Sequence, residues 1–252
     1  HFESTIISFA PLKPLNNRVD LDRVQVLSLD KKSGNNPLLI YKIARFLKKI
    51  EADIVQTHNW GTALEGILGA KLARIQGIIH AERGTIEEKK RNIVMQRFLW
   101  GLADQVLSVS EIHRKKMTRI VAFPQDKIKA IVNGVDTEKF SPNPEIKSEV
   151  RARLGLKKDS ICIGTVGSLR TVKNQMLLIN ACRDILPRFD QVEVLIVGEG
   201  PLKAQLLQAV SALGFSKKIH FAGAQTNIPE ILNVLDIFVL SSLSEGMPNA
   251  LL

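Results

Sequence analysis

Short apolar runs alternate with longer amphipathic stretches along almost the whole chain. The short runs are rich in Val, Ile and Leu and do not alternate with polar residues, which is typical of strands covered on both faces in a parallel sheet. They predict strands at residues 4–9, 24–29, 53–57, 77–80, 105–109, 128–132, 161–166, 192–197, 219–221 and 237–240. The amphipathic stretches predict helices at residues 38–50, 62–74, 86–102, 174–186 and 202–213.

This order of elements predicts an α/β protein built of parallel βαβ units. Residues 133–160 interrupt the rhythm with prolines, dense charge and no strand, so they indicate a linker and a connecting helix. We place a boundary near Ser141 and expect two Rossmann-like, doubly wound domains, residues 1–140 and 141–252, facing each other across a cleft. Such sheets bind ligands at the carboxyl ends of their strands.

The composition is that of a soluble globular protein, with 45% hydrophobic and 24% charged residues among 252. No run approaches the roughly 20 apolar residues that cross a bilayer. The net charge of +10 favours a nucleic acid, an anionic lipid or a phosphorylated substrate as partner. Nucleic acid is not expected, because no basic stretch is interleaved with stacking rings. Cys162 and Cys182 lie in apolar surroundings, as buried thiols of a reducing compartment do.

Candidate chemistry begins in the stretch from Ile237 to Leu252, which indicates a buried strand, a polar loop and a helix start. Pro248 is tolerated in a first helical turn, and backbone N–H groups at such a place can face an anion. Glu245 sits at the tip of the loop, where a carboxylate can hold hydroxyl groups. The alternative is an ordinary acidic loop residue.

A second strand-to-helix loop follows the strand at 161–166. Its Arg170 and Lys173 are three residues apart, so both can point toward one small volume. Together they suit a diphosphate whose charge grows as it leaves, and the alternative is two solvated cations. Gly198 and Gly200 mark a further turn where backbone can approach a ligand. The glycines do not follow the dinucleotide pattern, and no Walker lysine pattern occurs.

The motifs GSLRTVKN, VGEGP, IHFAG and LDIFVLSSLSEGMPNALL occur in an order that resembles the family-4 retaining glycosyltransferases. The segment NGVDTEKFSP resembles the hinge between the two domains of that family. The resemblance covers essentially the whole chain. It implies the glycosyltransferase B-type fold and the transfer of a sugar, with retained anomeric configuration, from a nucleotide-diphosphate sugar. It implies no metal, and no cofactor besides this donor substrate.

The resemblance also assigns roles. Arg170 and Lys173 match the pair that binds the donor diphosphate and stabilises the leaving nucleotide, and Glu245 matches the first glutamate of an E-x7-E motif that contacts the donor sugar. The second glutamate would be residue 253, and the family's N-terminal glycine-rich loop has no counterpart. We therefore expect a fragment that lacks its first strand and is inactive by itself. The remaining donor-side residues are Gly167, Gly198, Gly200, Gly246, Met247, Pro248 and Asn249.

In the first domain, His80 ends a predicted strand and matches the family's cleft histidine, beside the reacting sugar. His58 also ends a strand, and with Asn59 and Arg83 it is expected on the acceptor side. A histidine at a strand end is otherwise often held by backbone groups. The two other internal histidines are expected to be structural. A metal site is not expected, because the histidines and cysteines do not cluster in the sequence.

Residues 37–52 and 86–103 form basic amphipathic helices that can lie on an anionic membrane. The alternative for each is an ordinary sheet-covering helix with a solvated cationic face. The resulting expectation is a cytoplasmic glycosyltransferase, peripheral at the inner face of the membrane, that acts on a glycan or polyprenyl-linked acceptor in cell-surface polysaccharide biosynthesis. Two alternatives stay open, a nucleotide-sugar epimerase of the same fold and a non-catalytic nucleotide-sugar binding protein.

Overall fold

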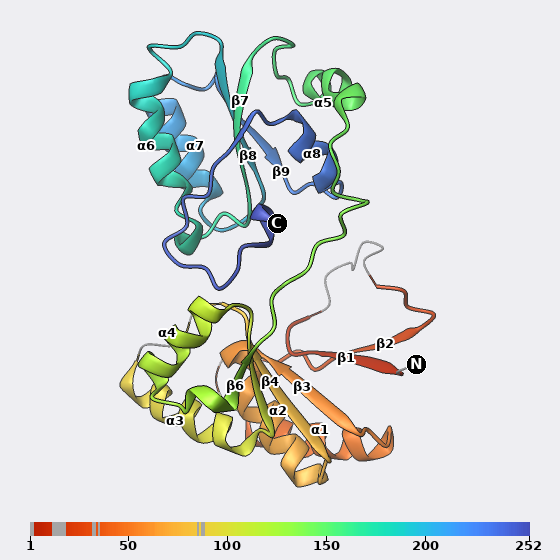
Figure 1. Cartoon of the computed structure of the whole chain (residues 1–252). Helices are drawn as coiled ribbons and strands as arrows, with labels where there is room; N and C mark the ends of the chain where they lie inside the picture. The colour runs from red at the N-terminus through yellow and green to blue at the C-terminus, as the bar shows by residue number, and fades with distance from the viewer. Residues whose placement is uncertain (1–2, 12–18, 32–33, 35, 85, 87–88) are drawn as a thin grey trace. The chain divides into compact units, whose positions relative to one another are not determined.

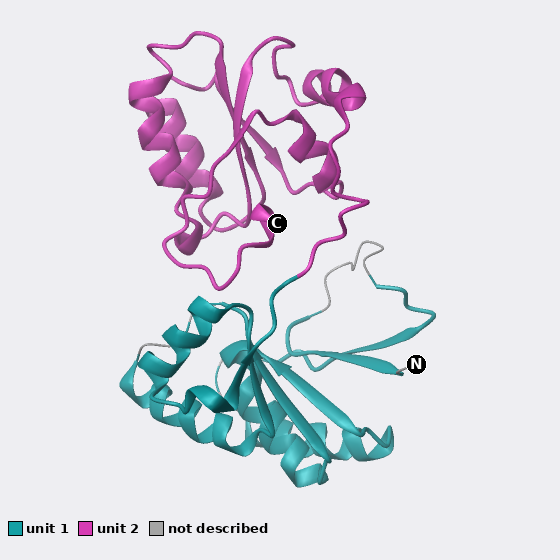
Figure 2. Cartoon of the chain, viewed as in Figure 1, with its two compact units in different colours: residues 1–133 teal, residues 134–252 magenta. Residues whose placement is uncertain are grey.

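The computed structural model describes residues 3–11, 19–31, 34, 36–84, 86 and 89–252. The chain divides into two compact units, His1–Asn133 and Gly134–Leu252, called unit 1 and unit 2 (Figure 2). Residues 134–143, at the start of unit 2, form neither helix nor strand. The expected boundary near Ser141 lies inside this irregular segment, which is how a linker between two compact units is built.

Unit 1 contains two parallel sheets among its described residues (Figure 1). The larger has the order β3–β4–β5–β6, from β3 (Ile54–His58), β4 (Gly77–Glu82), β5 (Gln105–Ser108) and β6 (Ile128–Ala130). The smaller pairs β1 (Ser4–Ser8) with β2 (Val24–Ser28). The helical elements are α1 (Pro37–Lys49), α2 (Asn59–Ala73), α3 (Lys90–Leu102), α4 (Glu111–Val121) and the 3-10 turn η1 (Gln125–Lys127).

Unit 2 contains one parallel sheet of order β10–β7–β8–β9, from β7 (Ile161–Val166), β8 (Val192–Val197), β9 (Ile219–Gly223) and β10 (Ile237–Phe238). Its helices are α5 (Lys147–Arg153), α6 (Gln175–Ile185), α7 (Lys203–Ala212) and α8 (Ile228–Val234). Three 3-10 turns complete the unit, η2 (Pro144–Ile146), η3 (Thr171–Lys173) and η4 (Asn249–Leu251).

Strand β8 shows why the apolar runs do not alternate with polar residues. Every residue of β8 is buried. Val194 and Ile196 pack with side chains of α6 and α7, whereas Leu195 and Val197 pack with side chains of α5 and α8. Helices therefore cover both faces of this sheet, as Figure 1 also shows, and unit 2 is doubly wound as predicted.

Helix α1 belongs to the core of unit 1. Its first turn is capped by Asn36, whose Oδ1 accepts a hydrogen bond from the N–H of Leu38. A β carbon on Gly69 of α2 would lie 2.7 Å from Cγ2 of Ile43, so the two helices pack this closely because residue 69 is glycine. The apolar face is thus used for packing, as the sheet-covering alternative predicts. Its buried side chains are Leu39, Ile43, Ala44 and Leu47.

Each predicted strand and helix has a counterpart, and α5 is the expected connecting helix. The helix predicted at 86–102 is α3, which begins at Lys90, and residues 87 and 88 of that prediction lie outside the described residues. Two helices, α4 (Glu111–Val121) and α8 (Ile228–Val234), were not predicted. Helix α4 buries only His113, Met117 and Val121, one narrow line along a strongly charged helix, and α8 has only seven residues. Strand β4 continues two residues beyond its predicted end at His80. His80, a predicted site residue, therefore lies inside the strand and not at its end.

A charged network fastens α5 to unit 2's sheet. The guanidinium of Arg151, whose side chain is 4% exposed, donates to the carbonyl of Ser160 at 2.7 Å and to Oδ2 of Asp236 at 2.6 Å. The same Oδ2 accepts the N–H of Cys162 at 2.7 Å, and Lys147 pairs with Oδ1. Burial alone would raise the pKa of Asp236, but these hydrogen bonds hold it below its ordinary value.

We predict that Asp236→Asn lowers the free energy of unfolding at pH 7 by roughly 3 kcal/mol, because Arg151 is left buried without a counter-charge. The depressed pKa means that the carboxylate's contribution is complete above about pH 4 and is lost as the pH falls through the folded-state value. The difference between wild type and variant should therefore shrink in acid. Urea unfolding at pH 7 and at pH 3 measures both differences.

The matched control is Asp190→Asn, because Asp190 is fully exposed and pairs with Lys218 at the surface. Its free energy of unfolding should stay within about 0.5 kcal/mol of wild type. Equal effects of the two substitutions would contradict the role given to Asp236.

Candidate functional site

Three loops meet at the carboxyl edge of the sheet in unit 2. They follow β7, β8 and β10 and comprise residues 167–174, 198–202 and 239–248. The N–H of Leu169 donates to the carbonyl of Glu199 at 3.0 Å, and the N–H of Leu243 donates to the carbonyl of Val172 at 2.8 Å. Backbone hydrogen bonds therefore join the first loop to both of the others.

Two glycines permit this contact. A β carbon on Gly198, which has φ +138°, would lie 1.9 Å from the carbonyl oxygen of Gly167. A β carbon on Gly200 would lie 2.4 Å from the carbonyl oxygen of Leu169. Both glycines were predicted to let backbone approach a ligand. In this structure they let one loop approach another, which fixes the backbone around the candidate site.

The charged residues of the site come from the first and third loops. Lys173 Nζ donates to Glu245 Oε1 at 2.6 Å, with 25% and 22% of the two side chains exposed. The hydroxyl of Ser241 donates to the carbonyl of Lys173 at 3.0 Å. Arg170 is exposed, and its guanidinium has no hydrogen bond or ion pair within the described part of the chain. The structure thus brings Lys173 and Glu245 together and leaves Arg170 open to solvent.

Gln175 holds the loop that carries Arg170, and sequence patterns did not single it out. Its side chain is 2% exposed, and its Nε2 donates to the carbonyl of Ser168 at 3.1 Å. Its Oε1 is buried without a hydrogen-bond partner among the described residues. The signal in the sequence was a polar residue at the first turn of an otherwise apolar helix face. Gly246, Met247 and Pro248 are half-buried, and the predicted helix start is the short turn η4.

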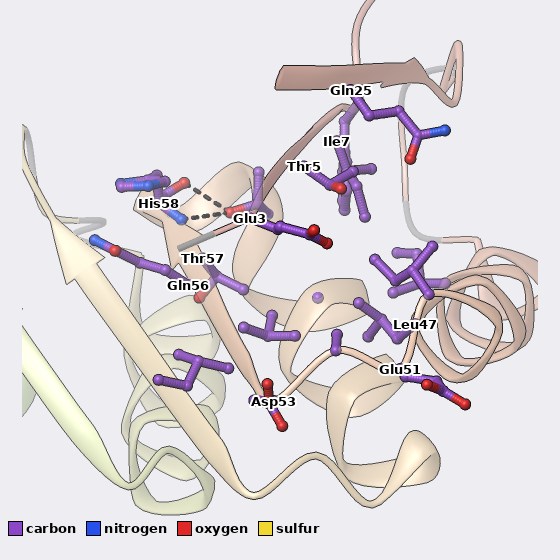
Figure 3. A pocket seen from close by; sticks show the side chains of 18 residues that line it. Glu3, Thr5, Ile7, Gln25, Leu47, Glu51, Asp53, Gln56, Thr57 and His58 are labelled. Carbon is purple, nitrogen blue, oxygen red and sulfur yellow. Dashed lines mark hydrogen bonds between the residues drawn. The ribbon is translucent and has the colours of Figure 1, made fainter. Parts of the chain in front are cut away.

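In unit 1, the ends of β3 and β4 bring three predicted residues together. His58 is the last residue of β3, and its backbone exchanges two hydrogen bonds with the hydroxyl of Thr62, drawn as dashed lines in Figure 3. Asn59 Oδ1 accepts the N–H of Arg83 at 2.9 Å. Burial, the Arg83 charge and His80 all lower the pKa of His58, so its imidazole is neutral at pH 7.

His80 lies beneath this surface and has no exposed atom. Its Nδ1 is 2.8 Å from the hydroxyl of Thr57, and its Nε2 is 3.6 Å from Oε2 of Glu82. Glu82, which is 1% exposed, accepts a hydrogen bond from Gln96 of α3 at 3.2 Å. The expected contact of His80 with a sugar does not fit this geometry, because β4 runs on to Glu82 and leaves His80 inside the strand.

A cavity of about 770 Å³ lies between β1 and β3, above α1 (Figure 3). Thr57 and His58 lie on its wall near the carboxyl end of β3, and Glu51 and Asp53 lie near the other end. Thr5 and Ile7 of β1 line the opposite side. Among the described residues that line this cavity, His58 is the one that was also predicted as a site residue.

The described residues gather neither metal ligands nor reactive thiols at these places. Within the described residues no three His, Cys, Asp or Glu side chains lie close enough to hold a metal ion. Cys162 and Cys182 are free and buried, as expected. Burial raises the pKa of each thiol to about 11, so both are neutral at physiological pH.

The fold and these loops define an α/β protein of two parallel-sheet units with charged residues at the carboxyl edges of its strands. Residues 1–139 match the model of Glycosyltransferase Family 4, and residues 146–252 match that of Glycosyl transferases group 1. The chain belongs to glycosyltransferase family 4. The predicted family and fold class are confirmed.

Named relatives agree with this family. The chain is 31% identical over 227 residues to the Escherichia coli UDP-Gal:alpha-D-GlcNAc-diphosphoundecaprenol alpha-1,3-galactosyltransferase, a match that covers 84% of this chain and 58% of the relative. It is 28% identical over 167 residues to the Rhizobium meliloti lipopolysaccharide core biosynthesis mannosyltransferase LpsB, covering 64% of this chain and 45% of the relative. The chain therefore matches about half of the length of these relatives.

A solved structure supports the fold. Anabaena Alr3699/HepE, solved in complex with UDP and glucose, has a TM-score of 0.77 at 18% identity, covering 96% of this chain and 74% of that chain.

We predict that Gly198→Ala lowers the free energy of unfolding by about 3 kcal/mol or more, since it adds a clash with the carbonyl of Gly167 to the strain of positive φ. Gly214→Ala is the control, because Gly214 has φ +74° but open space around its Cα. It should cost only about 1 kcal/mol. Thermal unfolding compares the stability of the two variants. Equal losses of stability would show that the two loops can move apart to accept a β carbon at position 198.

Proposed function

We propose that the natural protein is a retaining, metal-independent hexosyltransferase that moves a sugar from a nucleotide-diphosphate sugar to a glycan or lipid-linked acceptor in cell-surface polysaccharide biosynthesis. The observation that carries the proposal is the convergence of Arg170, Lys173 and Glu245 on neighbouring loops at one sheet edge. Membership of the family and the names of the relatives support it.

In the proposed reaction the donor occupies the loops of unit 2. Arg170 is exposed and unpaired among the described residues, so its planar fork is available to the diphosphate. Lys173 adds a second positive charge where negative charge grows as the glycosidic bond to the phosphate breaks. Glu245 accepts hydrogen bonds from sugar hydroxyls. The backbone of the glycine-bearing loops and of residues 246–249 lies against the donor.

The exposed ends of β3 and β4 form the proposed acceptor side. A neutral His58 can accept a hydrogen bond from an acceptor hydroxyl, and Asn59 and Arg83 offer further polar groups. The buried His80 takes a positioning role in this scheme, because it is hydrogen-bonded to Thr57, the residue before His58, and does not reach the surface.

A lipid-linked acceptor would bring the enzyme to a membrane, and α3 offers a surface for it. No helix in the described ranges is long and apolar enough to span a bilayer. The outer face of α3 exposes Val94 and Phe98, at 70% and 58%, beside Lys90, Arg91 and Arg97. Exposed apolar side chains flanked by cations suit the surface of an anionic bilayer. We propose peripheral attachment at the inner face of the membrane through α3.

We predict that Arg170→Ala and Lys173→Ala each lower turnover by about a hundredfold and donor affinity by less, because both cations meet charge that builds only as the bond breaks. Radiolabelled sugar transfer by the full-length protein measures this. Arg183→Ala is the control, since Arg183 is exposed in the last turn of α6, and it should be neutral. Near-normal turnover of either loop variant would refute the assignment. Donor turnover without acceptor separates transfer from epimerisation and from binding alone.

We predict that Lys89, Lys90 and Arg91, changed together to Gln, weaken binding to anionic vesicles strongly at low salt and hardly at high salt. Each cation near such a surface contributes about 1 kcal/mol, which fades within a Debye length. Vesicle sedimentation across a salt series, run beside a thermal melt, measures the effect. The control changes three exposed lysines of α1, Lys42, Lys48 and Lys49. Equal losses from both triples would remove α3 from this role.

A further inference from the structure

The Lys173–Glu245 ion pair joins two residues that the proposed function gives to different parts of one ligand. Lys173 is assigned to the diphosphate and Glu245 to the sugar, yet their side chains are 2.6 Å apart and about three-quarters buried. Arg170, the other cation of the site, has no such partner among the described residues. A diphosphate can therefore reach Arg170 directly, but it must compete with Glu245 for Lys173.

The backbone cannot relieve this competition by moving the two residues apart. Next to Lys173, the carbonyl of Val172 accepts the N–H of Leu243, and the carbonyl of Lys173 itself accepts the hydroxyl of Ser241. These two bonds tie the loop of Lys173 to the loop of Glu245 close to the pair. Ligand binding must therefore exchange side-chain partners within a fixed frame.

We propose that Glu245 determines the preference of the site for an intact sugar nucleotide over the free nucleoside diphosphate. The inference rests on the proposed function. A free diphosphate that draws Lys173 away leaves the Glu245 carboxylate partly buried, without its cation and close to further negative charge, which is unfavourable. An intact donor brings sugar hydroxyls that donate hydrogen bonds to Glu245 in place of Lys173. Only the second ligand satisfies both members of the pair.

The same competition acts after transfer. Once the sugar has left with the acceptor, Glu245 loses its hydroxyl partners and again competes for Lys173. The hold of Lys173 on the remaining nucleoside diphosphate weakens, and release of this product is favoured. Glu245 is in this sense a specificity-determining residue whose charge, and not only its hydrogen bonding, is required.

The experiment measures binding of UDP, GDP and ADP, and of their glucose and galactose derivatives, to the full-length protein by calorimetry. The nucleotide that binds wild type most tightly is then used throughout. Glu245→Gln keeps the size and the acceptor oxygen but removes the charge. We expect it to bind the free nucleoside diphosphate about tenfold more tightly, the size of effect that close charge pairs produce. Its affinity for the intact donor should not rise.

Two comparisons make the result specific. Glu230→Gln removes a carboxylate of α8 that pairs with Arg153 of α5, outside the three loops, and it should leave the ratio of the two affinities unchanged. In a Lys173→Met background, Glu245→Gln should no longer tighten binding of the nucleoside diphosphate. Thermal melts verify that each variant is folded.

The outcomes separate the two proposals. Failure of wild type to bind any of the nucleotides would overturn the proposed function, and this inference with it. Normal wild-type binding with an unchanged affinity ratio in Glu245→Gln would overturn the inference alone. Equal tightening of both ligands, or the same effect from Glu230→Gln, would also overturn the inference.

Discussion

The candidate site depends on one close approach of backbone to backbone. The loop after β8 can touch the loop after β7 only because positions 198 and 200 have no side chain to place between them. The contact then fixes the loop backbone that carries the side chains of Arg170 and Lys173. A site that handles a highly charged ligand needs such a frame, because electrostatic stabilisation is largest when the charged groups do not have to reorganise.

The buried polar cluster of unit 1 plays a comparable part below the surface. Thr57, His80 and Glu82 lie on adjacent strands, and Gln96 joins them to α3. A carboxylate that is almost wholly buried is costly unless its hydrogen bonds are made, so the cluster restrains how these strands and α3 pack. His58 and Arg83 stand at the edge of this region, and the cluster therefore supports them without meeting a ligand itself.

Most of the fold could be predicted from the sequence, because the spacing of apolar residues and the length of each apolar run are local signals. Runs such as that of β8 are unambiguous, whereas α4 was hidden by its charge, since its buried line of three residues is too thin to stand out. Within the site, Arg170, Lys173 and Glu245 were found from loop position and family resemblance. The ion pair between Lys173 and Glu245 could not be predicted, because the two residues meet only through the sheet order that sets β10 beside β7. The burial of His80 was missed for a similar reason, as two more residues of ladder were decided by pairing with β5.

The separation of the two sheets in unit 1 has a consequence for how the unit holds together. Among the described residues β1 makes ladder hydrogen bonds only to β2, and β3 only to β4, with the cavity between them. The β1–β2 pair is attached to the rest of the unit mainly through side chains, including Ile7, Phe9 and the Lys31–Glu65 ion pair. Hydrogen exchange should therefore divide unit 1 into two zones, since a two-stranded ribbon held by few contacts opens far more readily than a four-stranded sheet packed on helices. Amides along the cavity edge of β3 would exchange early although the strand itself stays folded.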